Sequence, residues 1–242
     1  MVRITNIAFF AASFSVASAS CLSGTRLAAR AADGTVAIST FNYTGEGGPL
    51  NWYGLNTTTN GACSKGKNQS PIDIVTQSIT YASTSSLNFS VPTVPSAKFE
   101  NLGTNVEVVI NGSLVTSNLT YELAQFHFHT PSEHRINEEY FPMEAHFVYE
   151  TSVTPGTFTE TGPLDFTGLT KHFNTHGVYY YSGSLTTPPC SENVAWYIST
   201  EPLPLNVQTY NAVKKVLKFN ARYTQNTLGR DNLLEVSAAE LQ

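Results

Sequence analysis

The chain has 242 residues, of which 41% are hydrophobic and 13% are charged, and its formal net charge is -5. This length is sufficient for a single domain with one sizeable core. The negative balance disfavours nucleic acid as a partner, and beyond the N-terminal region no apolar run requires a membrane span.

The N-terminal residues have the pattern of a secretory signal peptide. Arg3 precedes the apolar run IAFFAASFSV, and the small-residue site Ala17-Ser18-Ala19 follows. We therefore expect residues 1–19 to be a signal peptide with cleavage near Ser20, and a short buried N-terminal strand is the alternative. Residues 20–40 are small and polar, typical of a flexible leader, so the folded domain is expected to span residues 41–242.

Export would permit two covalent modifications. Glycosylation becomes possible at the six Asn-x-Ser/Thr sequons, which begin at Asn42, Asn56, Asn68, Asn88, Asn111 and Asn118. Three cysteines in an exported chain suggest one disulfide and one leftover thiol. Cys63 with Cys190 is the favoured pair because Cys21 lies almost at the predicted cleavage point, and Cys21 with either of the others is the alternative.

The domain is expected to be mainly β, in an α+β arrangement with short peripheral helices. Aromatic and β-branched runs separated by Gly, Pro and Asn predict strands. They are LNFSV, NVEVVI, AQFHFH, EAHFVYE, GVYYYSG and VAWYIST. Only residues 206–219 space their apolar side chains as an amphipathic helix would.

Two of these runs concentrate histidines. Alternate side chains of a strand point to one face, so Gln125, His127 and His129 would project together, with about 6 to 7 Å between successive members. The same alternation aligns Glu144 with His146 in the next run. If the two runs pair as antiparallel neighbours, three imidazoles can converge on one point.

Three converging imidazoles favour a catalytic zinc site. Zinc is tetrahedral, and three protein ligands leave its fourth position for water. Gln125 and Glu144 are placed to accept hydrogen bonds from His127 and His146, which would fix the orientation of each ring. A lone His-x-His pair is usually not a metal site, but Gln-x-His-x-His followed by Glu-x-His at strand spacing is far less common by chance.

With these residues, the sequence resembles the α-class carbonic anhydrases. The blocks that carry the resemblance occur in the family's order and cover most of the chain after Phe41. They are NYTGEGGPLNWYGL (42–55), QSPIDI (69–74), QFHFHTPSEHRIN (125–137), MEAHFVYE (143–150), YYYSGSLTTPPCSENVAWYI (179–198) and KFNARYTQ (218–225). The resemblance implies a central, twisted, mostly antiparallel sheet of about ten strands or fewer, with zinc at the floor of a conical cavity.

The activity implied is reversible hydration of carbon dioxide to bicarbonate and a proton, by attack of zinc-bound hydroxide. By resemblance, Thr186 accepts a hydrogen bond from the nucleophile and donates one to Glu133. The positions that match the family's substrate pocket are Val148, Leu185, Val194, Trp196, Thr186 and Thr187. A zinc-dependent esterase or peptidase would share the metal, but no second general base is apparent.

The resemblance also assigns structural roles. His134 matches a buried histidine bonded to Glu133 and Tyr181, and is therefore not expected to bind the metal. Asn220 is expected to offer its backbone carbonyl to His129. Cys63 and Cys190 match the disulfide positions of extracellular members of the family.

The chain departs from the family pattern at the proton-transfer position. Fast members have a histidine there, whereas this chain has Thr104, whose hydroxyl cannot relay protons with a pKa near 7. Slower or more buffer-dependent turnover is expected. His172 or His176 could substitute, but both lie outside every matched catalytic block, and an ordinary loop role is the favoured interpretation.

The resemblance implies that a segment after Val148 is missing. By resemblance an apolar strand would follow there, beside both the His146 strand and the Trp196 strand, but in this chain only FVYETSVTPGTFTETGP precedes LDFTGL. The sheet must therefore close up, gape or recruit a partner. This departure supports a second hypothesis, a catalytically weak or inactive binding module related to carbonic anhydrases.

Overall fold

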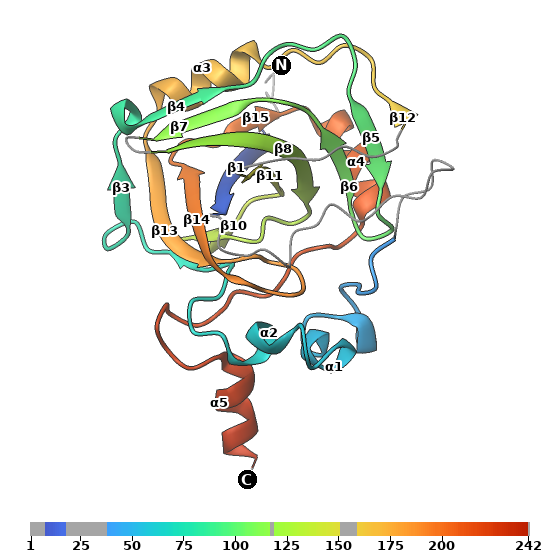
Figure 1. The fold of residues 1–242 in the computed structure, drawn as a ribbon, viewed down its shortest axis with the longest axis vertical. Coiled ribbons are helices and arrows are strands. Elements are labelled where there is room, and N and C mark those ends of the chain that lie inside the picture. The colour runs from blue at the N-terminus through green and yellow to red at the C-terminus, as the bar shows by residue number, and fades with distance from the viewer. Residues whose placement is uncertain (1–7, 18–37, 117–118, 151–158, 242) are drawn as a thin grey trace, which may run out of the picture.

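The computed structural model describes residues 8–17, 38–116, 119–150 and 159–241. In these ranges the chain forms one large curved sheet, a small second sheet and short helices (Figure 1). The strands are β1 (Ala8–Ala17), β2 (Asp73–Ile74), β3 (Thr80–Ala82), β4 (Leu87–Ser90), β5 (Lys98–Asn101), β6 (Val106–Val109), β7 (Ser113–Thr116), β8 (Thr120–His129), β9 (Arg135–Ile136), β10 (Glu139–Tyr140), β11 (Met143–Glu150), β12 (Thr159–Glu160), β13 (Val178–Ser184), β14 (Glu192–Ser199) and β15 (Leu203–Leu205). The helices are α1 (Trp52–Leu55), α2 (Gly61–Lys65), α3 (Thr167–Thr175), α4 (Val207–Leu217) and α5 (Leu233–Glu240), with 3-10 turns at Gly45–Gly47 and Thr84–Ser86.

The large sheet has twelve strands within the described residues, and its main path is β12-β5-β6-β8-β11-β1-β14-β13-β3. Every pair in it is antiparallel except β1 with β11. The mainly β, mostly antiparallel fold is thus confirmed. The large sheet has more strands than the ten or fewer that the resemblance implies, because short strands such as β12 and β15 lack a clear sequence pattern and β1 falls within the expected signal peptide.

The six aromatic and β-branched runs all form strands, namely β4, β6, β8, β11, β13 and β14. The predicted amphipathic helix is α4, and the side chain of Asn206 caps it by accepting hydrogen bonds from the N–H groups of Gln208 and Thr209. Its Leu217 is buried, while Val216 faces solvent. Helices α3 and α5 were not predicted.

Strand β1 occupies the position where the sequence suggested a missing strand. It pairs with β11 in parallel and with β14 antiparallel, so it lies between the His146 strand and the Trp196 strand (Figure 1). The sheet is therefore continuous at this point, and β11 and β14 are joined through β1 rather than paired directly with each other. The shortened connection itself falls partly in residues 151–158, outside the described residues.

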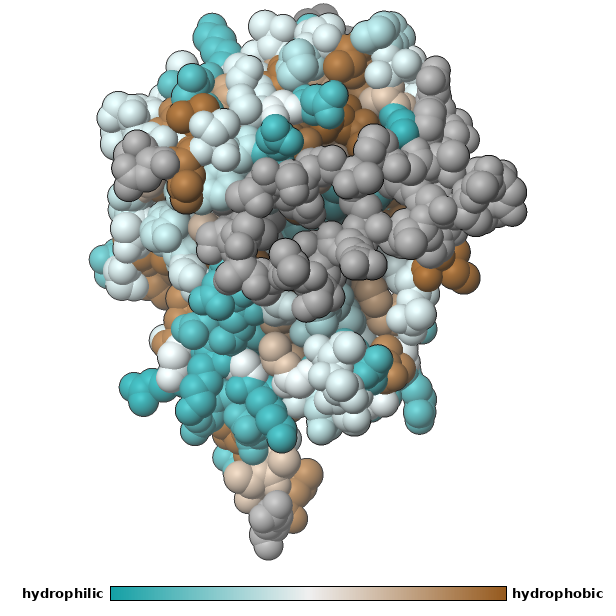
Figure 2. All heavy atoms as spheres, viewed as in Figure 1, coloured by the Kyte–Doolittle hydropathy of each residue, from teal (hydrophilic) through white to brown (hydrophobic). Residues whose placement is uncertain are grey.

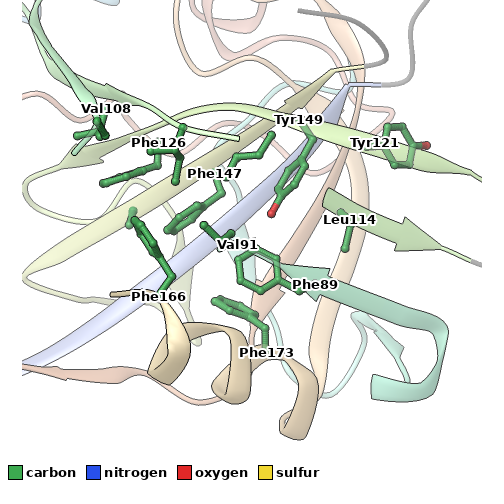
Figure 3. Packing of buried hydrophobic residues seen from close by; sticks show 14 of the residues in the cluster. Phe89, Val91, Val108, Leu114, Tyr121, Phe126, Phe147, Tyr149, Phe166 and Phe173 are labelled. Atoms are coloured by element: carbon green, nitrogen blue, oxygen red, sulfur yellow. The ribbon is translucent and has the colours of Figure 1, made fainter. Parts of the chain in front are cut away.

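The main core lies on one face of the sheet, beneath α3. Phe166, which immediately precedes α3, and Phe173 within it point toward Phe126, Phe147 and Phe89 (Figure 3). Phe126 and Phe147 stack with their ring centroids 5.2 Å apart. Because neighbouring residues of β8 and β11 alternate between faces, this packing leaves the histidines of both strands on the opposite face.

The disulfide joins Cys63 in α2 to Cys190, which precedes β14. Both cysteines are fully buried beside Trp52 and Tyr43. Cys21 lies outside the described residues, so its fate stays a prediction.

Removing this disulfide with Cys63→Ser and Cys190→Ser is expected to lower the free energy of unfolding by about 2–5 kcal/mol, because the bond closes a long loop in the unfolded chain. The two cysteines are 127 residues apart in sequence. Urea unfolding followed by tryptophan fluorescence would measure the change. Cys21→Ser is the control, and an equal effect of that substitution would contradict the assignment.

No helix in the described ranges is long and apolar enough to cross a membrane. Figure 2 shows that hydrophobic residues on the visible, described surface occur in separate small groups among hydrophilic ones.

Candidate metal centre and active site

Strands β8 and β11 bring the three predicted ligands together. They pair antiparallel, with His127 opposite His146 and His129 opposite Glu144. The ring centroid of His127 lies 5.1 Å from that of His129 and 5.1 Å from that of His146. The His129 and His146 centroids are 4.5 Å apart. Each residue offers one nitrogen, and these nitrogens all lie within 4.8 Å of one another.

Each ring has one nitrogen engaged by the protein. Nδ1 of His127 is 2.8 Å from Oε1 of Gln125, and Nδ1 of His129 is 2.6 Å from the backbone oxygen of Asn220. Nε2 of His146 is 2.7 Å from Oε1 of Glu144. The remaining nitrogens are Nε2 of the first two rings and Nδ1 of the third.

The free nitrogens are suited to a metal. Nε2 of His129 is buried and has no hydrogen-bond partner among the described residues, and a buried polar atom without a partner is costly. A tetrahedral ion with nitrogen ligands at about 2.0–2.1 Å would satisfy it. The donor set of three imidazoles, each oriented by an acceptor, is one that zinc favours.

The histidines are held neutral, as metal binding requires. Burial lowers the pKa of His129 to about 4 and places that of His127 well below its ordinary value. The pKa of His146 is also lowered, by burial first and then by the nearby His129. At neutral pH no proton has to leave these rings before a cation binds.

A second group, His134, Glu144 and His146, also lies close enough to hold an ion. The atoms of this group already hydrogen-bond to one another. Oε1 of Glu144 is 2.8 Å from Nδ1 of His134 and 2.7 Å from Nε2 of His146. Although burial raises the pKa of Glu144, its interactions with His134 and His146 hold that pKa well below the ordinary value. This group is therefore a network that supports the first site.

Glu133 is fully buried in the loop that follows β8. Its Oε1 accepts a hydrogen bond of 2.8 Å from the backbone N–H of Arg222. The hydroxyl of Thr186 lies near enough to lower the pKa of Glu133, and Oε2 of Glu133 has no hydrogen-bond partner among the described residues. Burial is the larger influence and raises the pKa of Glu133 to about 7.

His134 is buried and contacts Tyr181, as expected, with Nε2 2.5 Å from the phenol oxygen. Its other nitrogen contacts Glu144 and not Glu133, which corrects the expected pairing. The reason is local: Glu144 also accepts the backbone N–H groups of Glu133 and His134, so its carboxylate lies under this loop. Tyr181 is in turn 2.7 Å from the hydroxyl of Ser70.

Two of the predicted pocket-wall residues, Val148 and Trp196, lie near His146. Val148 is two residues after His146 and so lies on the same face of β11. Trp196 on β14 has its ring 5.0 Å from that of His146, and its indole N–H donates to the backbone oxygen of Ser184. Val194 and Trp196 are buried in one apolar cluster, against which Leu185 packs. Thr186 is buried, and Thr187 accepts a hydrogen bond from the N–H of Cys190.

The remaining predicted positions are spread over both faces of the sheet. Thr104 lies between β5 and β6 and donates a hydrogen bond to the hydroxyl of Ser39. His172 is in α3, where Nε2 contacts Ser199 and the backbone oxygen of Glu201, and its ring stacks on that of His176. Since α3 covers the opposite face of the sheet, neither histidine is placed to serve the site.

Sequence reasoning missed two buried residues at the base of the site. Arg222 donates from its guanidinium to the backbone oxygens of Ser70 and Cys63, and it lies over the ring of Trp52. Tyr43 packs edge-on against His129, and burial places the pKa of its phenol well above the ordinary value. Both occur in quoted motif blocks, but only the tertiary contacts reveal their position.

Comparison with known proteins agrees with this geometry. The sequence profile described as eukaryotic-type carbonic anhydrase matches residues 47–162 and 151–233, two stretches that overlap in the segment after Val148. A carbonic anhydrase of Neisseria gonorrhoeae is 33% identical over 190 residues, covering 65% of this chain and 73% of that protein. One from Pectobacterium atrosepticum is 30% identical over 222 residues, covering 78% and 88% respectively.

Solved structures show the same relationship. A fungal α carbonic anhydrase from Aspergillus oryzae is 54% identical, with a TM-score of 0.77, covering 83% of this chain and 99% of that one. The α carbonic anhydrase of Thermovibrio ammonificans, solved in complex with the inhibitor sulfanilamide, is 31% identical with a TM-score of 0.68, covering 80% and 98%. The profile match spans well over half of the chain, and the chain therefore belongs to the family of eukaryotic-type, or α, carbonic anhydrases.

Proposed function

We propose that this protein is a zinc enzyme that interconverts carbon dioxide and bicarbonate. Family membership supports the reaction, and one observation supports the metal. Three neutral imidazoles offer one nitrogen each within 4.8 Å of one another, and the buried Nε2 of His129 has no hydrogen-bond partner among the described residues. An ion bound by His127, His129 and His146 would complete the site.

Zinc held by these residues would supply a nucleophile at neutral pH, since it lowers the pKa of water to about 7, a value known from carbonic anhydrases themselves. Gln125, Glu144 and the backbone of Asn220 hold the rings in the orientation that this requires. These acceptors also make the imidazoles better donors to a cation.

Thr186 and Glu133 would aim the nucleophile. The backbone N–H of Arg222 binds Oε1 of the Glu133 carboxylate, which would leave Oε2 to accept a hydrogen bond from the Thr186 hydroxyl. With its hydroxyl hydrogen donated to Glu133, the Thr186 oxygen would be available only as an acceptor, and it could then orient the nucleophile that the metal would supply.

The substrate would lie against the apolar wall formed by Val148, Leu185, Val194 and Trp196. Carbon dioxide has no net dipole, so a wall without hydrogen-bonding groups suits it better than it suits water or bicarbonate. By the resemblance described above, the backbone N–H of Thr186 is the group that contacts a substrate oxygen. Product release as an anion is favoured because the same wall offers bicarbonate little stabilisation.

Metal content and carbon dioxide hydration of the purified chain test this proposal together. We expect one zinc per chain, hydration activity, and inhibition by an aromatic sulfonamide. Zinc without hydration would indicate the binding module instead, and a folded preparation that binds no zinc would contradict the zinc enzyme.

The position of Thr104 predicts a slow proton-transfer step. Its hydroxyl already donates to Ser39 and cannot exchange protons near pH 7. We expect imidazole buffer to raise turnover by about tenfold or more, and Thr104→His to reduce that response. Stopped-flow hydration assays at increasing imidazole concentration would measure it, with Thr104→Ser as the control. Fast turnover that does not respond to buffer would refute the prediction.

We also propose an extracellular location. The Cys63–Cys190 disulfide supports an oxidising compartment. Five of the six sequon asparagines, Asn42, Asn56, Asn68, Asn88 and Asn111, lie exposed where a glycan could attach. The sixth, Asn118, is outside the described residues.

A further inference from the structure

Within the described residues, β1 is the only strand that joins the two parts of the large sheet by backbone pairing. One part ends at β11 and the other begins at β14. It pairs in parallel with β11 from Phe10 to Val16 and antiparallel with β14 from Ser13 to Ala17, while its first residues pair with β15. In the strand order, β11 has β8 on its other side and β14 has β13. Removing β1 would leave two strand edges facing each other with nothing between them.

These two edges carry the active site. Ser13 of β1 lies opposite His146, and Ser15 lies opposite both Val148 and Trp196. The third metal ligand and two residues of the pocket wall therefore have their backbone positions set by pairing with β1. Unpaired N–H and C=O groups here would also face the middle of a sheet, where each costs free energy unless water or another strand reaches it.

The composition of the segment suits a central strand. Residues 8–17 read AFFAASFSVA and contain no charge, proline or glycine. A strand with neighbours on both sides and covered faces is typically a continuous apolar run without strict alternation. The same property made the segment resemble the core of a signal peptide.

We propose that residues 8–17 remain in the folded, metal-binding protein as the strand that holds β11 to β14. Cleavage near Ser20, which the sequence alone predicts, would remove this strand entirely. The two fates of the segment exclude each other in one molecule, so the N-terminus of the folded protein distinguishes them.

Cross-linking tests the pairing without reference to zinc or activity. Val16 lies opposite Ala195 in the antiparallel ladder, and opposed residues have Cα separations of about 4.5–5.5 Å, within the range of a disulfide. The full chain carrying Cys21→Ser, Val16→Cys and Ala195→Cys would be made in an oxidising cytosol and mapped by mass spectrometry. Formation of the native Cys63–Cys190 bond reports folding.

The matched control replaces Ala195→Cys with Ser199→Cys, four residues further along β14 and about 13 Å away. We expect at least about tenfold more of the 16–195 cross-link than of the 16–199 cross-link in chains that contain the native disulfide. Equal yields, or no 16–195 cross-link in those chains, would overturn the proposal. This result is independent of the proposed function.

Two further measurements link the strand to the metal site, and they rest on the proposed function. Ser15→Pro removes a backbone donor in the middle of β1 and is expected to lower zinc retained per chain about tenfold or more, while Ser15→Thr retains it. In protein made through a secretory pathway, peptide mapping of the zinc-loaded fraction should recover the N-terminal residues. Unchanged zinc retention in Ser15→Pro, or a zinc-loaded fraction that begins near Ser20, would contradict the proposal.

Discussion

Replacing His146 with alanine is expected to abolish zinc retention and hydration activity. The two remaining imidazoles, His127 and His129, lie on one strand and cannot enclose an ion with the geometry that tight zinc binding needs. The substitution also leaves Glu144 without one of its two histidine partners, although the contact with His134 persists. Metal analysis after dialysis against a weak chelator would measure the loss.

His172→Ala is the matched control. It removes a half-buried imidazole of the same size from the opposite face of the sheet, where the ring contacts Ser199 and Glu201. We expect its zinc content and hydration rate to remain those of the unmodified chain. Equal zinc retention in the His146→Ala and His172→Ala proteins would show that the ligand assignment is wrong.

Thr186→Ala is expected to lower kcat/KM for hydration by about 100- to 1,000-fold while zinc content stays unchanged, since a single positioned hydrogen bond in an active site has an effect of this size. The alanine keeps the backbone N–H but removes the hydroxyl, which lies near Glu133. Stopped-flow measurement of hydration together with metal analysis would separate loss of orientation from loss of zinc.

Thr186→Ser provides the control for this prediction, because it retains a hydroxyl that can donate to Glu133. Its kcat/KM is expected to stay within about tenfold of the unmodified chain, the smaller loss arising from the freer rotation of serine. If alanine and serine reduce the rate equally, the hydroxyl has no orienting role. If either variant loses zinc, Thr186 instead contributes to the integrity of the site.

Much of the site could be predicted because it depends on local periodicity. Alternation along β8 and β11 places His127, His129 and His146 on one face, and their register then follows from antiparallel pairing. The acceptors Gln125 and Glu144 belong to the same alternation, so they too were visible in the sequence. The resemblance to a known family supplied Asn220, whose contact with His129 joins positions 91 residues apart.

The remaining features depend on tertiary contacts that no local pattern reveals. Arg222 lies near Glu133 and Trp52 only because the chain after α4 passes beneath the loop of Glu133. The assignment of Glu144 rather than Glu133 to His134 likewise depends on how that loop folds over the carboxylate. The sequence does not predict helix α3, because few of its residues are apolar and the segment resembles a loop. Phe173 is its only buried residue.

The N-terminal segment shows a different limit of sequence reasoning. A run of ten uncharged residues meets the requirements of a signal peptide core and of a buried central strand equally well. Only the pairing of the segment with β11 and β14 distinguishes the two uses. Composition alone therefore could not place Ala8–Ala17 in the sheet.

Zinc-edge X-ray absorption of the purified chain, with zinc as the only added metal, is the most direct test of the metal site. Three imidazole nitrogens and one oxygen at about 2.0–2.1 Å are expected. His127→Ala should remove one nitrogen from the shell or prevent loading. A shell containing sulfur, or a shell of three nitrogens that persists in His127→Ala, would contradict a site built from His127, His129 and His146.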